Sequence, residues 1–320
     1  MTAIVRQFTS LAHQEILEEV ACPLCGAHDD SPAMVARDRL FGRPGAYPLV
    51  RCDACAMLYV NPRPTPDALG AHYPDDYFAY ALPTDMPKAF RPLLQWLTRG
   101  ISLQRIRYLE KAMGRIPSDA SIVDVGCGIN SLLWWIRRLR GAEGIGVDFK
   151  QEVVDWVRAE LGMRVERGTL KEVAFEPASV DVVTMTEYLE HEPNPRDVLD
   201  EARRVLKPGG HLAIEIPDPT GWPARTFGSA WWNLDVPRHL VFFEPSTLER
   251  MLDQCGFDLV RVQRFGLPFY VGTSLYQALG LRYSPRYHGL FLLLSGLLGA
   301  PFAPFTPLVP EFLFAVARAR

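Results

Sequence analysis

Residues 121–148 constrain the fold of this chain more than any other segment. A short apolar run at 122–125 ends in Gly126-Cys127-Gly128, an apolar helical stretch follows, and a second run at 144–147 ends in Asp148. The order strand, glycine-rich turn, helix, strand and acid is the nucleotide-binding half of a doubly wound α/β domain. The glycines let the backbone approach a ligand closely because they carry no Cβ. A carboxylate that closes the second strand can accept hydrogen bonds from both hydroxyls of a ribose.

The glycine-rich turn departs from the dinucleotide-binding pattern G-x-G-x-x-G, because Ser131 occupies the place of the third glycine. A dehydrogenase would also need a catalytic Tyr-Lys or His pair, and no such pair is suitably placed. Both observations argue against a dehydrogenase.

The composition fits a soluble globular protein with one large and one small domain: 320 residues, 48% hydrophobic and 22% charged. The net charge of −3 gives no basic field, so nucleic acid is not expected as a partner. No apolar leader segment is visible, and six cysteines without a secretory signal indicate a reducing compartment. We expect a cytoplasmic protein.

Four of the cysteines form two C-x-x-C knuckles with 26 residues between them. Each knuckle can offer two thiolates to one tetrahedral ion, as in Cys₄ zinc ribbons, and a hairpin at 34–47 would fill the spacer. Buried cysteines or a redox pair are the alternatives. We expect a structural Zn²⁺ and an N-terminal zinc-ribbon module at 1–62, because so small a unit needs a metal to supplement its core. The predicted ligands are Cys22, Cys25, Cys52 and Cys55.

A proline- and tyrosine-rich connector follows the knuckles, and residues 88–113 carry apolar side chains at helical spacing. We treat 63–117 as a connector with an edge helix, and 118–320 as the main domain. Strands and helices alternate there, which predicts a parallel sheet with right-handed crossovers. The expected elements are helix 150–161, strand 164–167, strand 180–185, a helix near 195–205, strand 211–216, helix 245–255, strand 257–265 and a final strand at 312–320.

Asp124 before the Gly-x-Gly turn, together with the turn Lys207-Pro-Gly-Gly210, resembles the class I S-adenosylmethionine-dependent methyltransferases. The second knuckle and the Leu-Tyr-Val-Asn-Pro-Arg-Pro that closely follows it resemble the zinc ribbon fused to bacterial methyltransferases of sugar and cell-envelope pathways. The resemblance implies a seven-stranded Rossmann-like sheet with a final antiparallel strand pair, and S-adenosyl-L-methionine as cofactor. It places Asp124, Gly126 and Gly128 at the methionine end, Asp148 at the ribose, Thr169 and Leu170 beside adenine, and Glu187 near the sulfonium.

The segment Glu187-Tyr-Leu-Glu190-His191 ends the fourth strand of this domain, where a methyl acceptor must dock. His191 or His239 could act as a general base on an acceptor hydroxyl. Alternatively, Glu187, Glu190 and His191 form an E-x-x-E-H site for a second divalent metal, which resembles the ubiquinone-pathway O-methyltransferases and the small-RNA 2′-O-methyltransferases. A purely structural role for Glu190-His191 is the third interpretation.

The segment 231–243 combines aromatic, amide, acidic, arginine and histidine residues in an expected loop. Such a set could stack on an acceptor ring and orient its hydroxyls, with Arg238 meeting a phosphate. A packed loop with an Arg–Asp pair and core tryptophans is the alternative.

Residues 267–310 interrupt the final strand pair, and 287–310 contain no Asp or Glu and no Lys or Arg. Prolines interrupt this stretch too early for a membrane span. An apolar lid, a dimer surface, a peripheral contact with the inner face of the membrane, or buried core are the remaining interpretations. The oligomeric state stays open.

These observations predict methyl transfer to an oxygen of a sugar, a lipid-linked glycan or a quinone-like small molecule. A metal-dependent O-methyltransferase is one alternative. A non-catalytic cofactor-binding scaffold, which recruits a partner through the ribbon, is the other.

Overall fold

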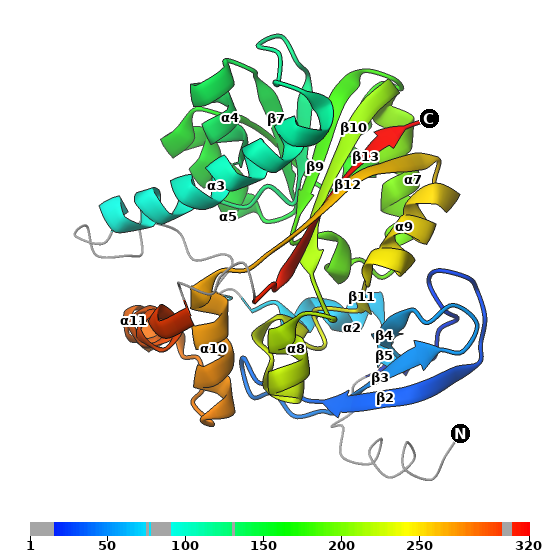
Figure 1. The fold of residues 1–320 in the computed structure, drawn as a ribbon, viewed down its shortest axis with the longest axis vertical. Coiled ribbons are helices and arrows are strands. Elements are labelled where there is room, and N and C mark those ends of the chain that lie inside the picture. The colour runs from blue at the N-terminus through cyan, green and yellow to red at the C-terminus, as the bar shows by residue number, and fades with distance from the viewer. Residues whose placement is uncertain (1–15, 75–76, 78–90, 130–131, 303–308) are drawn as a thin grey trace.

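The computed structural model describes residues 16–74, 77, 91–129, 132–302 and 309–320, with backbone only for 91–98, 285 and 288. Its centre is a seven-stranded sheet in the order β12-β13-β10-β9-β6-β7-β8 (Figure 1). All neighbouring strands are parallel except β13, which runs antiparallel to both β10 and β12. This is the doubly wound sheet with a final antiparallel strand that the sequence predicts. The strands are β6 Ile122–Val125, β7 Gly144–Asp148, β8 Arg164–Arg167, β9 Val180–Thr186, β10 Leu206–Pro217, β12 Phe257–Phe265 and β13 Phe312–Ala319.

The inner strands of the sheet are buried on both faces, which explains their largely apolar sequences, whereas the edge strands β8 and β12 are partly exposed. Alternate residues of one strand point to opposite sides. Thus Ile122 packs in one hydrophobic cluster and Val123 in the other. One face is covered by α3 Arg91–Met113, α4 Leu132–Arg140 and α5 Gln151–Trp156. The other is covered by α6 Leu170–Val173, α7 Pro195–Val205 and α9 Pro245–Gln254.

Two predicted elements differ in detail. The helix expected at 150–161 changes after Trp156 into a π-helical turn, η6 Val157–Leu161, and ends at Gly162 with φ +59°. The turn at Lys207-Pro-Gly-Gly210 lies inside β10 as an irregularity, because the pairing register with β9 shifts between Leu206 and His211.

The N-terminal residues form a second, four-stranded sheet in the order β11-β4-β3-β2. The predicted hairpin is present and longer than expected, since Asp30 already pairs with Cys52. The edge strand β11 comes from far along the chain, and the sheet packs on the same core as α7 and α9. Its strands are β2 Asp30–Ala36, β3 Tyr47–Cys52, β4 Leu58–Val60 and β11 Val241–Phe242, beside the short pair β1 Leu17–Glu18 and β5 Arg63–Pro64.

Short helices join these layers. The connector holds α2 Pro66–Leu69 and η2 Gly70–His72, and the loop after β9 holds η7 Leu189–His191. After β10 come α8 Trp222–Phe227, η8 Gly228–Ala230 and η9 Trp232–Leu234. The insertion before β13 holds α10 Pro268–Ala278, η10 Pro285–Tyr287 and α11 His288–Gly299. Among the described helices, none combines the length and apolarity that a membrane crossing requires.

Candidate active site

The strand order reverses beside β6, because β7 and β8 lie on one side of it and β9 and β10 on the other. Ligands of open α/β sheets bind in the crevice at such a switch point, outside the carboxyl ends of the strands. Four predicted cofactor residues lie at this edge: Asp124, Gly126, Gly128 and Asp148. Ser131 lies outside the described residues.

Gly126 has two reasons to be glycine. Its φ is +66°, and an added Cβ would come within 2.4 Å of the Tyr188 ring. The Gly128 amide donates to Asp148 Oδ2 at 3.0 Å, and the Lys150 amide donates to Asp148 Oδ1 at 2.9 Å. The glycine-rich turn and Asp148 are therefore joined by a hydrogen bond. Each carboxylate oxygen of Asp148 can still accept a hydrogen bond from a further donor.

Asp124 is buried under the turn. Thr184 Oγ1 donates to its Oδ1 at 2.5 Å, while Oδ2 has no hydrogen-bond partner among the described residues. Burial raises the pKa of Asp124 to about 6. A buried carboxylate oxygen without a donor fits a positively charged or hydrogen-bonding ligand.

The two residues expected beside adenine have local structural roles. Thr169 is the N-cap of α6: its hydroxyl accepts from the Glu172 amide at 3.2 Å, and Glu172 Oε2 accepts from the Thr169 amide at 2.8 Å. Leu170 is buried in the core beneath it. The sequence pattern Thr-x-x-Glu already contains this capping box.

Glu187 turns toward Arg105 on α3, whose Nη2 lies 3.4 Å from Glu187 Oε1. Arg105 also forms a bidentate ion pair with Glu215 on β10. Its Nε donates to Oε2 at 2.8 Å, and its Nη2 donates to Oε1. Glu187 itself has φ +53°, which is costly for a residue with a Cβ. Sequence analysis missed Arg105 and Glu215, although an arginine inside an otherwise apolar helix face was a usable signal.

Glu190, His191 and His239 come together near the end of β9, with one ligand atom of each within 4.8 Å of the others. The imidazole rings of His191 and His239 meet edge to face, with centroids 4.5 Å apart. Glu190 is 1% exposed, and neither carboxylate oxygen has a hydrogen-bond partner among the described residues. Burial raises the pKa of Glu190 well above its ordinary value. The structure thus brings His239 to Glu190 and His191, where the metal hypothesis placed Glu187.

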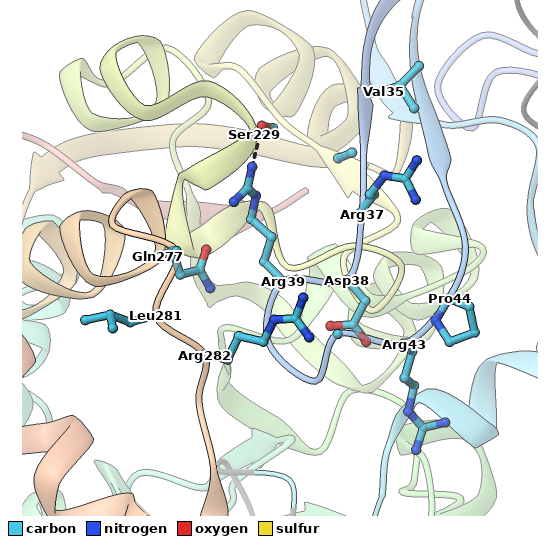
Figure 2. Close-up of a pocket in the computed structure, with 13 residues that line it drawn as sticks. Val35, Arg37, Asp38, Arg39, Arg43, Pro44, Ser229, Gln277, Leu281 and Arg282 are labelled. Atoms are coloured by element: carbon cyan, nitrogen blue, oxygen red, sulfur yellow. Dashed lines mark hydrogen bonds between the residues drawn. The ribbon is translucent and has the colours of Figure 1, made fainter.

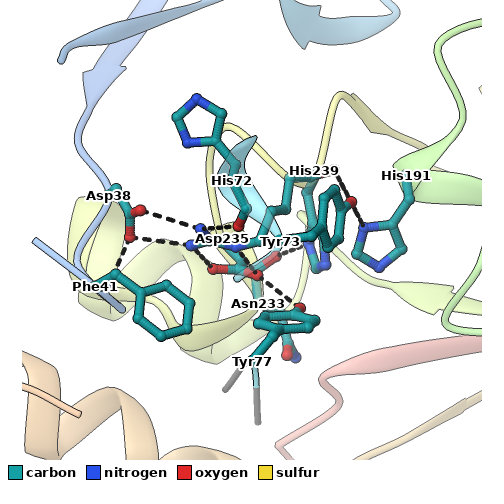
Figure 3. Close-up of polar contacts among 10 residues, drawn as sticks. Asp38, Phe41, His72, Tyr73, Tyr77, His191, Asn233, Asp235 and His239 are labelled. Carbon is teal, nitrogen blue, oxygen red and sulfur yellow. Dashed lines mark hydrogen bonds and ion pairs between the residues drawn. The ribbon is translucent and has the colours of Figure 1, made fainter. Parts of the chain in front are cut away.

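The hydrogen bonds orient both rings. His239 Nδ1 donates to the Asn233 carbonyl at 2.8 Å, since a carbonyl can only accept. His191 Nδ1 lies 3.1 Å from the Arg238 carbonyl and 2.9 Å from the Tyr73 hydroxyl (Figure 3). If each ring carries its proton on Nδ1, these contacts are satisfied and each Nε2 keeps a free lone pair. Burial lowers both pKa values, that of His191 to about 3, so both rings stay neutral near pH 7.

Arg238, which precedes His239 in the chain, is held by Asp38 and Asp235, two residues labelled in Figure 3. It is fully buried, donates to both oxygens of Asp38 at 3.0 Å, and contacts both oxygens of Asp235 at 2.9 and 2.5 Å. The expected phosphate contact of Arg238 is wrong, because its guanidinium is saturated by two carboxylates. Asp38 comes from the N-terminal module, so this pair also ties that module to the loop before His239.

The tryptophans of segment 231–243 are core residues and present no free face to a ring. Trp231 packs with the N-terminal sheet and donates to Glu311 Oε2 at 3.2 Å. Trp232 stacks on Phe291 of α11, with centroids 5.3 Å apart. The packed-loop alternative describes this segment, and His239 is its contribution to the crevice.

The four predicted zinc ligands converge. Their sulfurs lie within 4.8 Å of one another, with Cys22 3.4 Å from Cys55 and Cys25 3.5 Å from Cys52, and none forms a disulfide. A tetrahedral Zn²⁺ with bonds of about 2.3 Å places its sulfurs about 3.8 Å apart. The two knuckles form turns of the same kind. The Gly26 amide donates to the Cys22 carbonyl and the Ala56 amide to the Cys52 carbonyl, both at 2.9 Å. The four thiols therefore fit this ion without rearrangement.

Known proteins resemble the main domain. The profile described as a methyltransferase domain matches residues 97–262. The ubiquinone biosynthesis O-methyltransferase of Aliivibrio fischeri (strain ATCC 700601 / ES114) is 33% identical over 183 residues, which cover 53% of this chain and 75% of that protein. The ubiquinone biosynthesis O-methyltransferase of Leptothrix cholodnii is 29% identical over 191 residues, 55% of this chain and 77% of that protein.

The fold has a solved counterpart in a geranyl diphosphate methyltransferase in complex with SAM. It aligns with a TM-score of 0.50 and 18% sequence identity, and covers 76% of this chain and 94% of that one. The sheet order, the glycine-rich turn and the matching profile agree. This chain belongs to the methyltransferase-domain family and is an S-adenosylmethionine-dependent methyltransferase.

Proposed function

We propose that this enzyme transfers a methyl group to an oxygen of a small molecule in the crevice beside Glu190, His191 and His239. The unpartnered, buried carboxylate of Glu190 beside two neutral imidazoles is the observation that supports this location. The cofactor supplies an electrophilic methyl group, and the protein contributes chiefly by positioning the acceptor oxygen in line with it.

The cofactor residues follow from the fit at the strand ends. Gly126 and Gly128 give the close backbone approach, Asp148 would accept from ribose hydroxyls, and buried Asp124 would face the charged methionine end. Glu187, which contacts Arg105, would lie near the sulfonium. Thr169 and Leu170 would border adenine only through the first turn of α6. The hydroxyl of Thr169 already accepts from the Glu172 amide as the N-cap of this helix.

A test of cofactor binding is calorimetric titration with S-adenosylmethionine. Asp148→Ala should weaken binding about tenfold or more, since it removes an acceptor for two hydroxyls. Asp155→Asn on the exposed side of α5 is the matched control and should bind like wild type. Equal affinity of both variants would remove Asp148 from the cofactor site.

Two chemistries remain for the acceptor site. As a base, His239 or His191 would take the hydroxyl proton on Nε2, but burial makes both rings weak bases. As metal ligands, neutral imidazoles and a carboxylate suit a divalent ion that would bind the acceptor oxygen and lower its pKa. Glu190 favours the metal, because a cation would satisfy both of its oxygens.

The acceptor class is proposed from the relatives. The named relatives are ubiquinone biosynthesis O-methyltransferases, and a quinol-like ring with adjacent hydroxyls offers two oxygens to a divalent ion. Sugars and lipid-linked glycans also carry adjacent hydroxyls and stay within the proposal.

We also propose that residues 1–62 are a zinc-ribbon module, with 63–117 as connector and edge helix before the methyltransferase domain at 118–320. All four zinc positions would be filled by Cys22, Cys25, Cys52 and Cys55, so the ion would be structural. Elemental mass spectrometry separates the two metals. Wild type should hold two ions per chain in Mg²⁺-containing buffer, and Glu190→Gln should hold only the zinc.

A further inference from the structure

A pocket of about 470 Å³ lies away from the strand ends, between the N-terminal module and the insertion. The loop after β2 forms one wall, the end of α10 forms the opposite wall, and Ser229 closes it (Figure 2). Four arginines line it: Arg37, Arg39, Arg43 and Arg282. None of the roles assigned above uses this pocket.

The charges of these arginines are not balanced by the pocket itself. Asp38 is its sole acidic lining residue, and both of its oxygens are occupied by Arg238. Arg39 donates to the Ser229 hydroxyl at 3.2 Å, and Arg43 donates to the Ala71 carbonyl, both uncharged acceptors. In the described part of the chain, Arg37 and Arg282 have no ion pair or side-chain hydrogen bond.

Two of these arginines line the pocket from separate elements. Figure 2 shows Arg39 extending toward Ser229 and Arg282 extending toward the loop that carries Asp38 and Arg39. Arg282 lies close to the backbone of that loop, since a Cβ placed on Gly42 would come within 3.0 Å of its Nη1. A multivalent anion in the pocket would be attracted by both charges.

We propose that this pocket binds a phosphate or diphosphate group. Guanidinium groups form bidentate hydrogen bonds with phosphate oxygens, and four of them suit an anion with two or more charges. This anion site is separate from the proposed methyl-acceptor site, and the fully buried Asp38–Arg238 pair links the residues that line the two.

The phosphate could belong to a soluble molecule or to a lipid headgroup. Leu281 lies on the pocket rim, and α11, which packs on α10, exposes Leu290, Leu293 and Leu297. These leucines occur at helical spacing without any charged residue in the helix. Such a face could enter the surface of an anionic membrane.

The test is binding of inorganic pyrophosphate to the full-length protein by calorimetry. Arg39→Gln/Arg282→Gln should weaken binding about tenfold or more. Arg115→Gln/Arg261→Gln removes the same charge from exposed positions elsewhere and should bind like wild type. Binding that the pocket variant leaves unchanged would overturn the proposal.

Vesicle sedimentation distinguishes the two sources. A lipid headgroup predicts binding to phosphatidylglycerol vesicles but not to phosphatidylcholine vesicles, with loss in both Arg39→Gln/Arg282→Gln and Leu293→Gln/Leu297→Gln. A soluble ligand predicts pyrophosphate binding without vesicle binding. Absence of both kinds of binding would refute the site.

S-adenosylmethionine binding, measured on the same samples, separates this proposal from the proposed function. The pocket variant should bind the cofactor like wild type. Pyrophosphate binding without cofactor binding would contradict the proposed function and support the anion site. Cofactor binding without pyrophosphate binding would support the proposed function and contradict the anion site.

Discussion

Glu190 shows how one buried side chain can indicate a reaction. Its carboxylate is buried and neither oxygen has a hydrogen-bond partner among the described residues, an arrangement that is costly unless a proton or a cation accompanies it. Glu190→Gln keeps the shape and removes the charge. We expect methyl transfer to fall by about 100-fold with little loss of cofactor affinity, as for the loss of a metal ligand or its partner. Glu249→Gln on the exposed face of α9 is the control in a turnover assay, and equal turnover in the two variants would contradict the assignment.

Glu311 predicts a pH-dependent stability. Trp231 and Asn233 donate to one of its oxygens, at 3.2 and 3.0 Å, and burial raises its pKa to about 8. Because the folded state holds this proton more tightly than the unfolded state, its stabilising contribution is full below the ordinary pKa. It is lost as the pH rises toward 8.

Glu311→Gln mimics the protonated form at every pH. The variant should gain on the order of 2 kcal/mol relative to wild type between pH 5 and pH 8, measured by urea unfolding. A difference in unfolding free energy that is the same at both pH values would show that Glu311 does not titrate in this range.

The two C-x-x-C knuckles allow a matched comparison of backbone strain. Gly26 has φ +74° and Ala56 has φ +62°, at equivalent positions of the two turns. No atom lies within 4 Å of a Cβ built on Gly26, so Gly26→Ala changes only the backbone preference. We expect a loss of about 1 kcal/mol for Gly26→Ala and a smaller gain for Ala56→Gly in thermal unfolding. Two losses of similar size would mean that the knuckles are not equivalent.

At the scale of elements, the N-terminal sheet depends on two distant contributions. The strand β11 completes it, and the Asp38–Arg238 pair joins it to the loop before His239. Cys22, Cys52 and Tyr59 also pack in the core shared with α9. Removing the metal from the ribbon should therefore disturb the acceptor site as well as the ribbon.

Prolonged treatment with a strong zinc chelator, or Cys25→Ser, should lower the melting temperature and reduce turnover together. Readdition of Zn²⁺ should restore both in the wild type only. Full turnover of a protein shown to be zinc-free would separate the ribbon from the active site.

Most of the main sheet was predictable because its inner strands are largely apolar segments between turn residues. Strands 164–167 and 257–265 were located to the residue. The turn at Asp124–Gly128 was predictable because only glycine fits its close approaches. The details that differ, the end of α5 and the irregularity in β10, depend on packing against neighbours.

The rest of the site could not be read from the chain because it forms by long-range contacts. His239 reaches Glu190 because the Leu240 amide donates to the Glu190 carbonyl at 2.8 Å and the preceding loop folds around Arg238. Arg105 meets Glu215 across 110 positions of sequence. The tryptophans of segment 231–243 fit both interpretations of that segment. The N-terminal sheet makes Trp231 a core residue, and the insertion does so for Trp232.

At the scale of the whole molecule, three layers converge on the carboxyl ends of the strands. The sheet supplies the cofactor turn, the N-terminal module and its loop support the acceptor side, and the insertion covers Trp232 and exposes leucines outward. The proposed cofactor and acceptor sites lie at these strand ends, so the reaction carried out there is the decisive observation.

The most direct measurement is transfer of labelled methyl from S-adenosylmethionine to a panel of hydroxyl acceptors, with and without phosphate groups and including a catechol-type ring. Product identity would be determined by mass spectrometry. We expect a labelled methyl ether in wild type and in Glu249→Gln, with loss in Glu190→Gln. Labelled product on nitrogen or carbon alone, or equal product from Glu190→Gln, would contradict oxygen methylation at the Glu190, His191 and His239 site.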